Sequence, residues 1–173
     1  GKKVLFSGTP CQVAAVNKIV QLKGFSNKLY TIDLVCLGVP SLTLFQKYLR
    51  YITKGKRIVS LNFRDKKDGW SKYRVKMEFE DGSSYASNHD RDYFFLAYLS
   101  KFFLNNICYD CPFSKIPRQG DVTLGDFWGA PRELHDEKGV SIVLVNSTKG
   151  KELMELLRNN VELIPAELKD IVR

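Results

Sequence analysis

The sequence lacks the features that mark several common classes of protein. Its 173 residues contain no apolar run near the roughly 20 residues that a membrane-spanning helix needs. It also shows no internal repeat, no low-complexity tract and no linker. Histidine is scarce, because His89 and His135 are the only two, so few side chains are available as a general base. We therefore expect neither a membrane-spanning protein nor a repeat protein.

The composition is that of a globular domain. With 44% hydrophobic and 27% charged residues, the chain can bury a full core, and its length suits one domain over residues 1–173. The net charge of +8 is compatible with binding to a nucleic acid, an anionic cofactor or an acidic partner. The basic residues form no long run, and no aromatic pattern of an RNA-binding sheet is present. These observations favour a solvated basic surface over a nucleic-acid partner.

The first residues bear on whether the protein is secreted and on its cellular compartment. The chain opens with Gly1-Lys-Lys-Val-Leu-Phe6, which reads as a β-strand and not as a secretory signal. This abrupt start predicts a domain cut from a longer protein. Four cysteines without a secretory signal predict a reducing, cytoplasmic compartment. In such a compartment, clustered cysteines serve metal or redox chemistry more often than structural disulfides.

The beginning of the chain predicts a strand–helix–strand unit. Residues 2–6 form a short apolar run that reads as a buried strand. A helix should start next, because Thr9 is a good N-cap, Pro10 suits the first helical position and Gln12 completes a capping box. A second strand follows at residues 29–35. A unit of this length predicts two parallel strands joined by a right-handed crossover.

The rest of the chain alternates between strand and helix patterns. Residues 57–64 and 73–79 alternate apolar and polar side chains, and with a short strand near Tyr85 they predict an antiparallel meander. The predicted class is α/β, with α+β as the alternative, in a single domain with a mixed sheet, a parallel βαβ start and this meander in the middle. The other expected elements are a helix capped by Ser41, an aromatic helix at 92–103, strands at 121–125 and 140–146, and a final helix at 149–159.

The positions of Cys11 and Cys36 predict that they are spatial neighbours. Cys11 falls in the first turn of the expected helix, and Cys36 falls just beyond the second strand. In a parallel unit, the loops that follow both strands lie at the same edge of the sheet, where ligands of open α/β sheets gather. The helix dipole and the amides of the first turn also favour a thiolate at Cys11.

Cys108 and Cys111 form a C-x-x-C pair that can complete a four-sulfur site. If their loop folds over the same edge, the four cysteines make a tetrathiolate that binds either a zinc ion or a [4Fe–4S] cluster. Structural zinc sites usually bring two C-x-x-C knuckles on small loops. Here one pair would join two isolated cysteines, which favours a cluster.

Other interpretations of the cysteines remain open at this point. The pair could be a thiol–disulfide centre, although such a pair is expected at a helix start after a buried strand. Cys11 alone could be a nucleophile, but both candidate base residues, His89 and His135, lie in polar, loop-like surroundings. A zinc-stabilised binding module with a basic docking surface is the third alternative, and each cysteine could also be a small core residue.

Five segments, taken in order, resemble the C-terminal domain of the coenzyme F-420 hydrogenase/dehydrogenase beta-subunit family over about residues 4–150. The stretch 151–173 carries no such marker. The segments are Ser7-Gly-Thr-Pro-Cys-Gln-Val13, Asp33-Leu-Val-Cys-Leu-Gly-Val-Pro40, Phe63-Arg-Asp-Lys66, Cys108-Tyr-Asp-Cys111 and Asp121-Val-Thr-Leu-Gly-Asp-Phe-Trp-Gly129.

The resemblance implies an iron–sulfur flavoprotein that is an enzyme as part of a full-length oxidoreductase. FAD would pass electrons between a [4Fe–4S] cluster and coenzyme F-420 or another electron carrier. The implied partners are an N-terminal ferredoxin-like, flavin-binding portion of the same protein and a redox partner protein or small-molecule carrier. The implied metal ligands are Cys11, Cys36, Cys108 and Cys111, and the implied residues near cluster and flavin are Gly8, Thr9, Gln12, Gly125 and Asp126.

Overall fold

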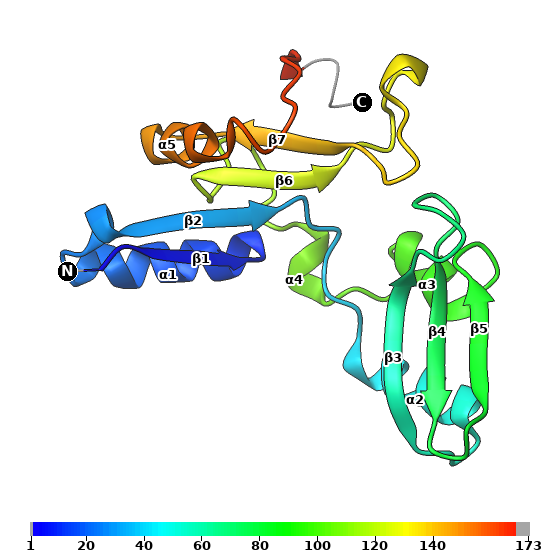
Figure 1. Ribbon diagram of the computed structural model, residues 1–173. Coiled ribbons are helices and arrows are strands. Elements are labelled where there is room, and N and C mark those ends of the chain that lie inside the picture. Colours follow the sequence, from blue (N-terminus) through cyan, green and yellow to red (C-terminus); the bar gives the residue numbers. More distant parts are fainter. Residues whose placement is uncertain (1, 169–173) are drawn as a thin grey trace. The chain divides into compact units, whose positions relative to one another are not determined.

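The computed structural model describes residues 2–168, and these divide into two compact units. The first unit holds the chain up to Cys36, Cys111–His135 and the chain from Val140 onward. The second unit holds Leu37–Asp110 and Asp136–Gly139. Each unit has a sheet of its own, as Figure 1 shows.

The first unit is built on a mixed four-stranded sheet. Its strands run in the order β1-β2-β6-β7, in which β2 is parallel to both β1 and β6, and β7 is antiparallel to β6. The elements are β1 (Val4–Gly8), α1 (Pro10–Leu22), the 3₁₀ turn η1 (Ser26–Lys28), β2 (Leu29–Leu34), β6 (Val122–Asp126), the 3₁₀ turn η2 (Arg132–Leu134), β7 (Ser141–Val145) and α5 (Thr148–Leu157).

The local sequence explains how the first strand turns into α1. Gln12 Oε1 accepts hydrogen bonds from Thr9 N at 2.9 Å and from Thr9 Oγ1 at 3.1 Å, and Pro10 is the first helical residue. The helix packs Val13, which is fully buried, into the unit. Because β1 and β2 then pair in parallel from Val4↔Leu29 to Gly8↔Asp33, the predicted βαβ start is confirmed.

The second unit is an antiparallel meander with short helices. Its strands run in the order β3-β4-β5, with antiparallel pairing throughout. The central strand buries every second side chain, including Val75 and Met77, because successive side chains point to opposite faces of the sheet and one face packs against residues of α2 and α3. The elements are α2 (Leu42–Thr53), β3 (Ile58–Asp65), β4 (Arg74–Phe79), β5 (Ser84–Asn88), α3 (Tyr93–Leu99) and α4 (Asn106–Tyr109).

The α/β class, the mixed sheet and the central meander are confirmed, and two details differ from expectation. The aromatic helix begins at its cap Asp92 as expected, but it ends at Leu99, and Lys101 beyond it has a left-handed φ of 59°. Sequence periodicity did not predict α4, because four residues are too few to show a helical pattern. Among the described residues, no helix combines the length and the apolar character needed to cross a bilayer.

Two buried carboxylates hold the middle of the first sheet together. Asp33, on β2, is fully buried and accepts hydrogen bonds from Thr123 Oγ1 and from the amides of Gln119 and Gly120. Asp121, just before β6, accepts from Thr31 N at 2.8 Å. These bonds satisfy polar groups that would otherwise be costly inside the protein, and they favour one register between β2 and β6.

The stability of this sheet should depend on pH through Asp121. Burial alone would raise the pKa of Asp121, but hydrogen bonds from Ser147 and Thr31 and the charge of Lys149 lower it below its ordinary value. A carboxyl of this kind stabilises the fold above its unfolded pKa of about 3.9, and the contribution is lost as pH falls through the folded pKa.

We therefore expect Asp121→Asn to lower the free energy of unfolding near pH 7 by about 1–3 kcal/mol and to flatten its decline below about pH 4. Urea unfolding from pH 7 down to pH 2.5 measures both effects. Asp90→Asn, at an exposed turn residue, is the control and should change neither. If the free energy of unfolding of Asp121→Asn falls with acid as steeply as that of the wild type, another carboxyl causes the acid transition.

Candidate functional site

The carboxyl ends of three parallel strands form the edge at which most of the predicted site residues lie. Gly8 pairs with Asp33 at the ends of β1 and β2, and Cys11 and Cys36 each follow one of these partners by three residues. The pairing of Leu34 with Leu124 aligns the end of β6 with the end of β2. This edge therefore carries Gly8, Thr9, Cys11, Gln12, Cys36, Gly125 and Asp126.

The residues around Cys11 shape the start of α1. Cys11 is exposed, and its Sγ atom lies 3.2 Å from Thr9 Oγ1. Gly8 lies close to Gln12, since a Cβ atom at position 8 would lie 2.9 Å from the end of that flexible side chain, at Oε1. Thr9 and Gln12 bond to one another across the helix start. Thr9 and Gln12 thus have structural roles that hold the Cys11 turn in place.

Gly125 is required by the close approach of the strand end that leads to Cys36. Val35 donates its amide to Leu124 O at 2.8 Å, which extends the contact between the two chain segments past the end of β2. A Cβ atom on Gly125 would lie 2.7 Å from Val35 Cγ2 and 3.0 Å from Val35 Cβ. The glycine therefore allows the residue before Cys36 to lie directly on β6.

Cys111 begins a turn that reaches the end of β2. Its carbonyl accepts hydrogen bonds from Ser114 N at 3.3 Å and from Ser114 Oγ at 2.9 Å. Arg118 then donates from Nη1 to Ser114 O at 2.8 Å and from Nη2 to Leu34 O at 2.7 Å. The turn that carries Cys111 is thereby bonded to the strand that precedes Cys36.

Cys108 belongs to the second unit, where it contacts the loop 37–40. Val39 N donates to Cys108 Sγ at 3.5 Å, and Tyr98 Oη donates to Gly38 O at 2.9 Å. Gly38 has a φ of 128°, and a Cβ atom there would lie 3.0 Å from Cys108 Cβ. The sulfur of Cys108 is thus held against a backbone amide, an arrangement that suits a thiolate ligand.

The structure brings three of the four cysteines into one unit. Cys11, Cys36 and Cys111 lie in the first unit and Cys108 in the second. Cys36, Cys108 and Cys111 are half-buried. Among residues 2–168, no group of three or more His, Cys, Asp or Glu side chains is arranged to hold a metal ion. The four-cysteine site therefore stays a prediction.

The observed geometry bears on two of the alternative interpretations. A thioredoxin-like pair is expected at a helix start, but Cys108 lies near the end of the short helix α4 and Cys111 lies beyond it. His89 stacks on Tyr73 at a centroid distance of 4.2 Å, and its Nδ1 atom lies 3.0 Å from Tyr73 O. This histidine is part of the packing of the second unit.

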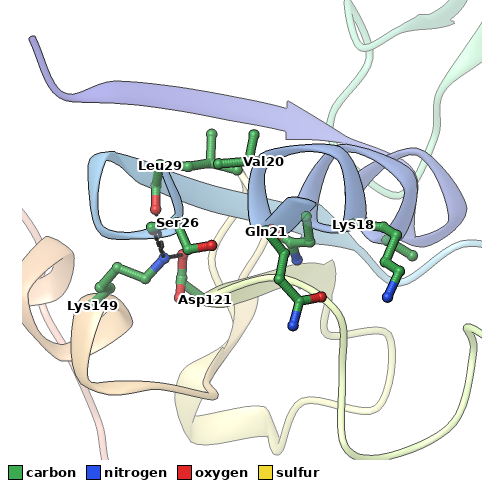
Figure 2. A pocket seen from close by; sticks show the side chains of 9 residues that line it. Lys18, Val20, Gln21, Ser26, Leu29, Asp121 and Lys149 are labelled. Carbon is green, nitrogen blue, oxygen red and sulfur yellow. Dashed lines mark hydrogen bonds and ion pairs between the residues drawn. The ribbon is translucent and has the colours of Figure 1, made fainter. Parts of the chain in front are cut away.

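A separate pocket of about 400 Å³ lies at the opposite edge of the first sheet (Figure 2). Leu29 starts β2 and Asp121 precedes β6, so the pocket is at the amino ends of these strands. Lys149 Nζ donates to Leu29 O at 2.5 Å and to Ser26 O at 3.3 Å, and lies 3.4 Å from Asp121 Oδ2. The ammonium group of Lys149 is therefore already bonded to two carbonyl oxygens and paired with the Asp121 carboxylate.

Comparisons with known proteins agree with this arrangement. Residues 1–170 match the family model that describes the C terminus of the beta subunit of coenzyme F420 hydrogenase/dehydrogenase. A solved structure of the F420-reducing [NiFe] hydrogenase complex from Methanosarcina barkeri contains a chain of similar fold, with a TM-score of 0.53 and 17% sequence identity. The match covers 92% of this chain and 49% of that one. No curated protein sequence matches the chain.

The first unit is thus an α/β unit with a mixed sheet, and cysteines follow the carboxyl ends of its parallel strands. The chain belongs to the family of C-terminal domains of coenzyme F420 hydrogenase/dehydrogenase beta subunits. The resemblance found in the sequence motifs is therefore confirmed. The chain spans about half the length of the solved relative.

Gly125→Ala should disturb the strand end that leads to Cys36. The added methyl group would overlap Val35, whose β-branched side chain has little freedom to move, so we expect a loss of about 1–3 kcal/mol of unfolding free energy. Gly129→Ala is the matched control, because its nearest heavy atom would be 4.0 Å away. Urea unfolding of the two variants measures the difference. Equal stability would show that the backbone adjusts without cost.

Gly38→Ala should displace the backbone around Cys108. The substitution combines an unfavourable φ with overlap at Cys108 Cβ, and we expect alkylation of the Cys108 thiol to become faster as the Val39 contact is lost. Gly55 has a similar positive φ of 90°, but a Cβ atom there would have no neighbour within 4 Å. Gly55→Ala therefore shows the effect of backbone strain without the effect of overlap. Peptide mapping after timed iodoacetamide treatment gives the rate. A wild-type rate in Gly38→Ala would contradict the steric role.

Proposed function

We propose that this chain is an electron-transfer domain of an iron–sulfur flavoprotein. In this proposal Cys11, Cys36, Cys108 and Cys111 provide the four thiolates of a [4Fe–4S] cluster. FAD works beside it, and coenzyme F420 or another electron carrier is the substrate. When bound, the cluster supplies one-electron chemistry that couples the flavin to a redox partner.

The observation that carries the proposal is the register of the parallel strands. Gly8 and Asp33 are direct partners in the sheet. Cys11 and Cys36 therefore each lie three residues beyond a matched position at the same edge. The Cys111 turn is bonded to Leu34 through Arg118 at this edge. Three thiol-bearing segments that are far apart in sequence thus converge on one edge of the first unit.

The surroundings of Cys108 and Cys111 also suit the proposal. Two residues separate the pair, so their Cα atoms are at most about 11 Å apart along the chain. Val39, whose amide donates to Cys108 Sγ, follows Cys36 by three residues. Hydrogen bonds from amides to ligand sulfurs are among the features that tune the potential of a cluster.

The chemistry of the donor set fits an iron–sulfur cluster. Four thiols also suit zinc, but structural zinc sites usually draw on two C-x-x-C knuckles. Here Cys11 lies in the first turn of α1, and Cys36 lies two residues beyond the end of β2. We therefore favour a cluster and treat zinc as an outcome of the test.

The proposed flavin contacts are backbone groups at the same edge. Gly8 and Thr9 precede α1, whose first-turn amides favour an anionic group such as a pyrophosphate. Gly125 and Asp126 end β6 at this edge, and Gln12 lies one turn away in the helix start. Because the chain matches only 49% of the relative's chain, we propose that further protein completes the flavin site and the docking surface for a redox partner.

The test is metal and flavin analysis of the full-length protein purified without oxygen. We expect a brown protein with FAD. Each single variant Cys11→Ser, Cys36→Ser, Cys108→Ser and Cys111→Ser should have about four iron atoms fewer than the wild type. Ser84→Ala, at an exposed residue of β5, is the control and should retain the wild-type iron content.

Three outcomes would reject the proposal. A wild type with about one zinc atom and no iron after anaerobic reconstitution would support a zinc-stabilised module instead. Full iron content in all four serine variants would exclude these cysteines as ligands. Thiol–disulfide exchange activity that depends on Cys108 and Cys111, in a protein without iron, would support the dithiol interpretation.

A further inference from the structure

We propose that Arg118 is a positioning residue for the sulfur ligands. Its guanidinium joins the turn of Cys111 to the strand that leads to Cys36, and its buried charge favours the reduced form of the group bound by these cysteines. The inference rests on the proposed function, and it concerns a residue to which the sequence motifs assign no role.

The hydrogen bonds of Arg118 connect two segments that are more than 80 residues apart in sequence. Nη2 donates to Leu34 O at 2.7 Å, and Nη1 donates to Ser114 O at 2.8 Å. Leu34 precedes Cys36 by two residues, and Ser114 bonds to the carbonyl of Cys111. One planar group therefore sets the separation of the two cysteine-bearing backbones.

The burial of this cation is unusual for a loop residue. Only 7% of the Arg118 side chain is exposed, and its Nε atom is buried without a hydrogen-bond partner in the described structure. A buried donor without a partner costs stability, so its presence calls for an explanation. We explain the buried cation by two roles: it holds the two segments together, and it places a positive charge at this edge.

The nearest anion compensates the charge only in part. Asp33 is fully buried, and its Oδ2 atom lies 3.8 Å from Arg118 Nη2, which is longer than a hydrogen bond. The oxygens of Asp33 instead accept from Thr123 Oγ1 and from the amides of Gln119 and Gly120. The guanidinium and the carboxylate thus form a loose buried ion pair near the ends of β2 and the Cys111 turn.

The geometry requires arginine in particular. A guanidinium donates from two nitrogens in one plane, whereas a lysine ammonium is a compact point charge that cannot span both carbonyls in the same way. Lysine would keep the charge and lose the bridge. Glutamine would lose both. These two variants therefore separate the two effects that we assign to Arg118.

The charge effect has a definite sign. Reduction adds a negative charge to the group that the cysteines bind, and a buried positive charge stabilises the more negative state. Removing the cation should therefore lower the midpoint potential. Removing the neighbouring anion by Asp33→Asn, with Arg118 left in place, should raise it.

The test uses the full-length protein in two measurements. In cluster-free protein, hydrogen exchange reports the backbone amides of residues 111–120, and we expect exchange to be at least tenfold faster in Arg118→Lys. In anaerobically reconstituted protein, a redox titration followed by EPR reports the potential. We expect Arg118→Gln to reduce the one-electron equilibrium constant about tenfold, a shift of about 59 mV to lower potential, with little shift in Arg118→Lys.

The matched control is Lys115→Gln, which removes a charge from an exposed side chain of the same loop and should change neither measurement. Wild-type exchange rates in Arg118→Lys would overturn the positioning role. A wild-type potential in Arg118→Gln would overturn the charge effect. If Arg118→Gln does not fold, Asp33→Asn decides the charge effect, because an unchanged or lower potential would contradict it.

Failure of the proposed function is distinguishable from failure of this inference. A wild type without iron would reject the cluster and with it the effect on potential. Hydrogen exchange in the cluster-free protein would still decide whether Arg118 holds the Cys111 turn. If the wild type contains iron but the Arg118 variants have wild-type exchange rates and potentials, only this inference is rejected.

Discussion

The parallel pairing of β2 with β1 and β6 is the constraint on which the rest of the first unit depends. Two buried carboxylates maintain the pairing of β2 with β6, because Asp33 and Asp121 accept hydrogen bonds that join β2 to β6 and to the residues before it. A shift of one residue would leave these oxygens without donors and would turn buried side chains to the other face of the sheet. The register thus determines which loops lie beside Cys36.

Two glycines allow the segments around the cysteines to pack closely. Gly125 admits Val35 against β6, and Gly38 admits Cys108 against the loop 37–40. In both cases a methyl group would overlap a neighbour within about 3 Å. The two segments that flank Cys36 therefore depend on the absence of a side chain, and this explains why glycines occur in the motifs that carry the family resemblance.

Much of the first unit was predictable from local sequence signals. The capping residues Thr9 and Gln12 fixed the start of α1, and the strand–helix–strand spacing predicted a common edge for Cys11 and Cys36. The meander was predictable because its strands alternate apolar and polar residues. Local signals did not predict α4, which is too short for a periodic pattern, or the roles of Gly38 and Arg118, which depend on contacts between distant segments.

The sequence alone determined the order of the strands and of the longer helices, the four thiols and the family to which the domain belongs. It could do so because caps, periodicity and motif order are local properties of the chain. Only the tertiary structure decided that Asp33 and Asp121 are buried between strands and that Arg118 bonds the Cys111 turn to Leu34. These features depend on pairing between residues about 80 to 90 positions apart, which no local pattern encodes.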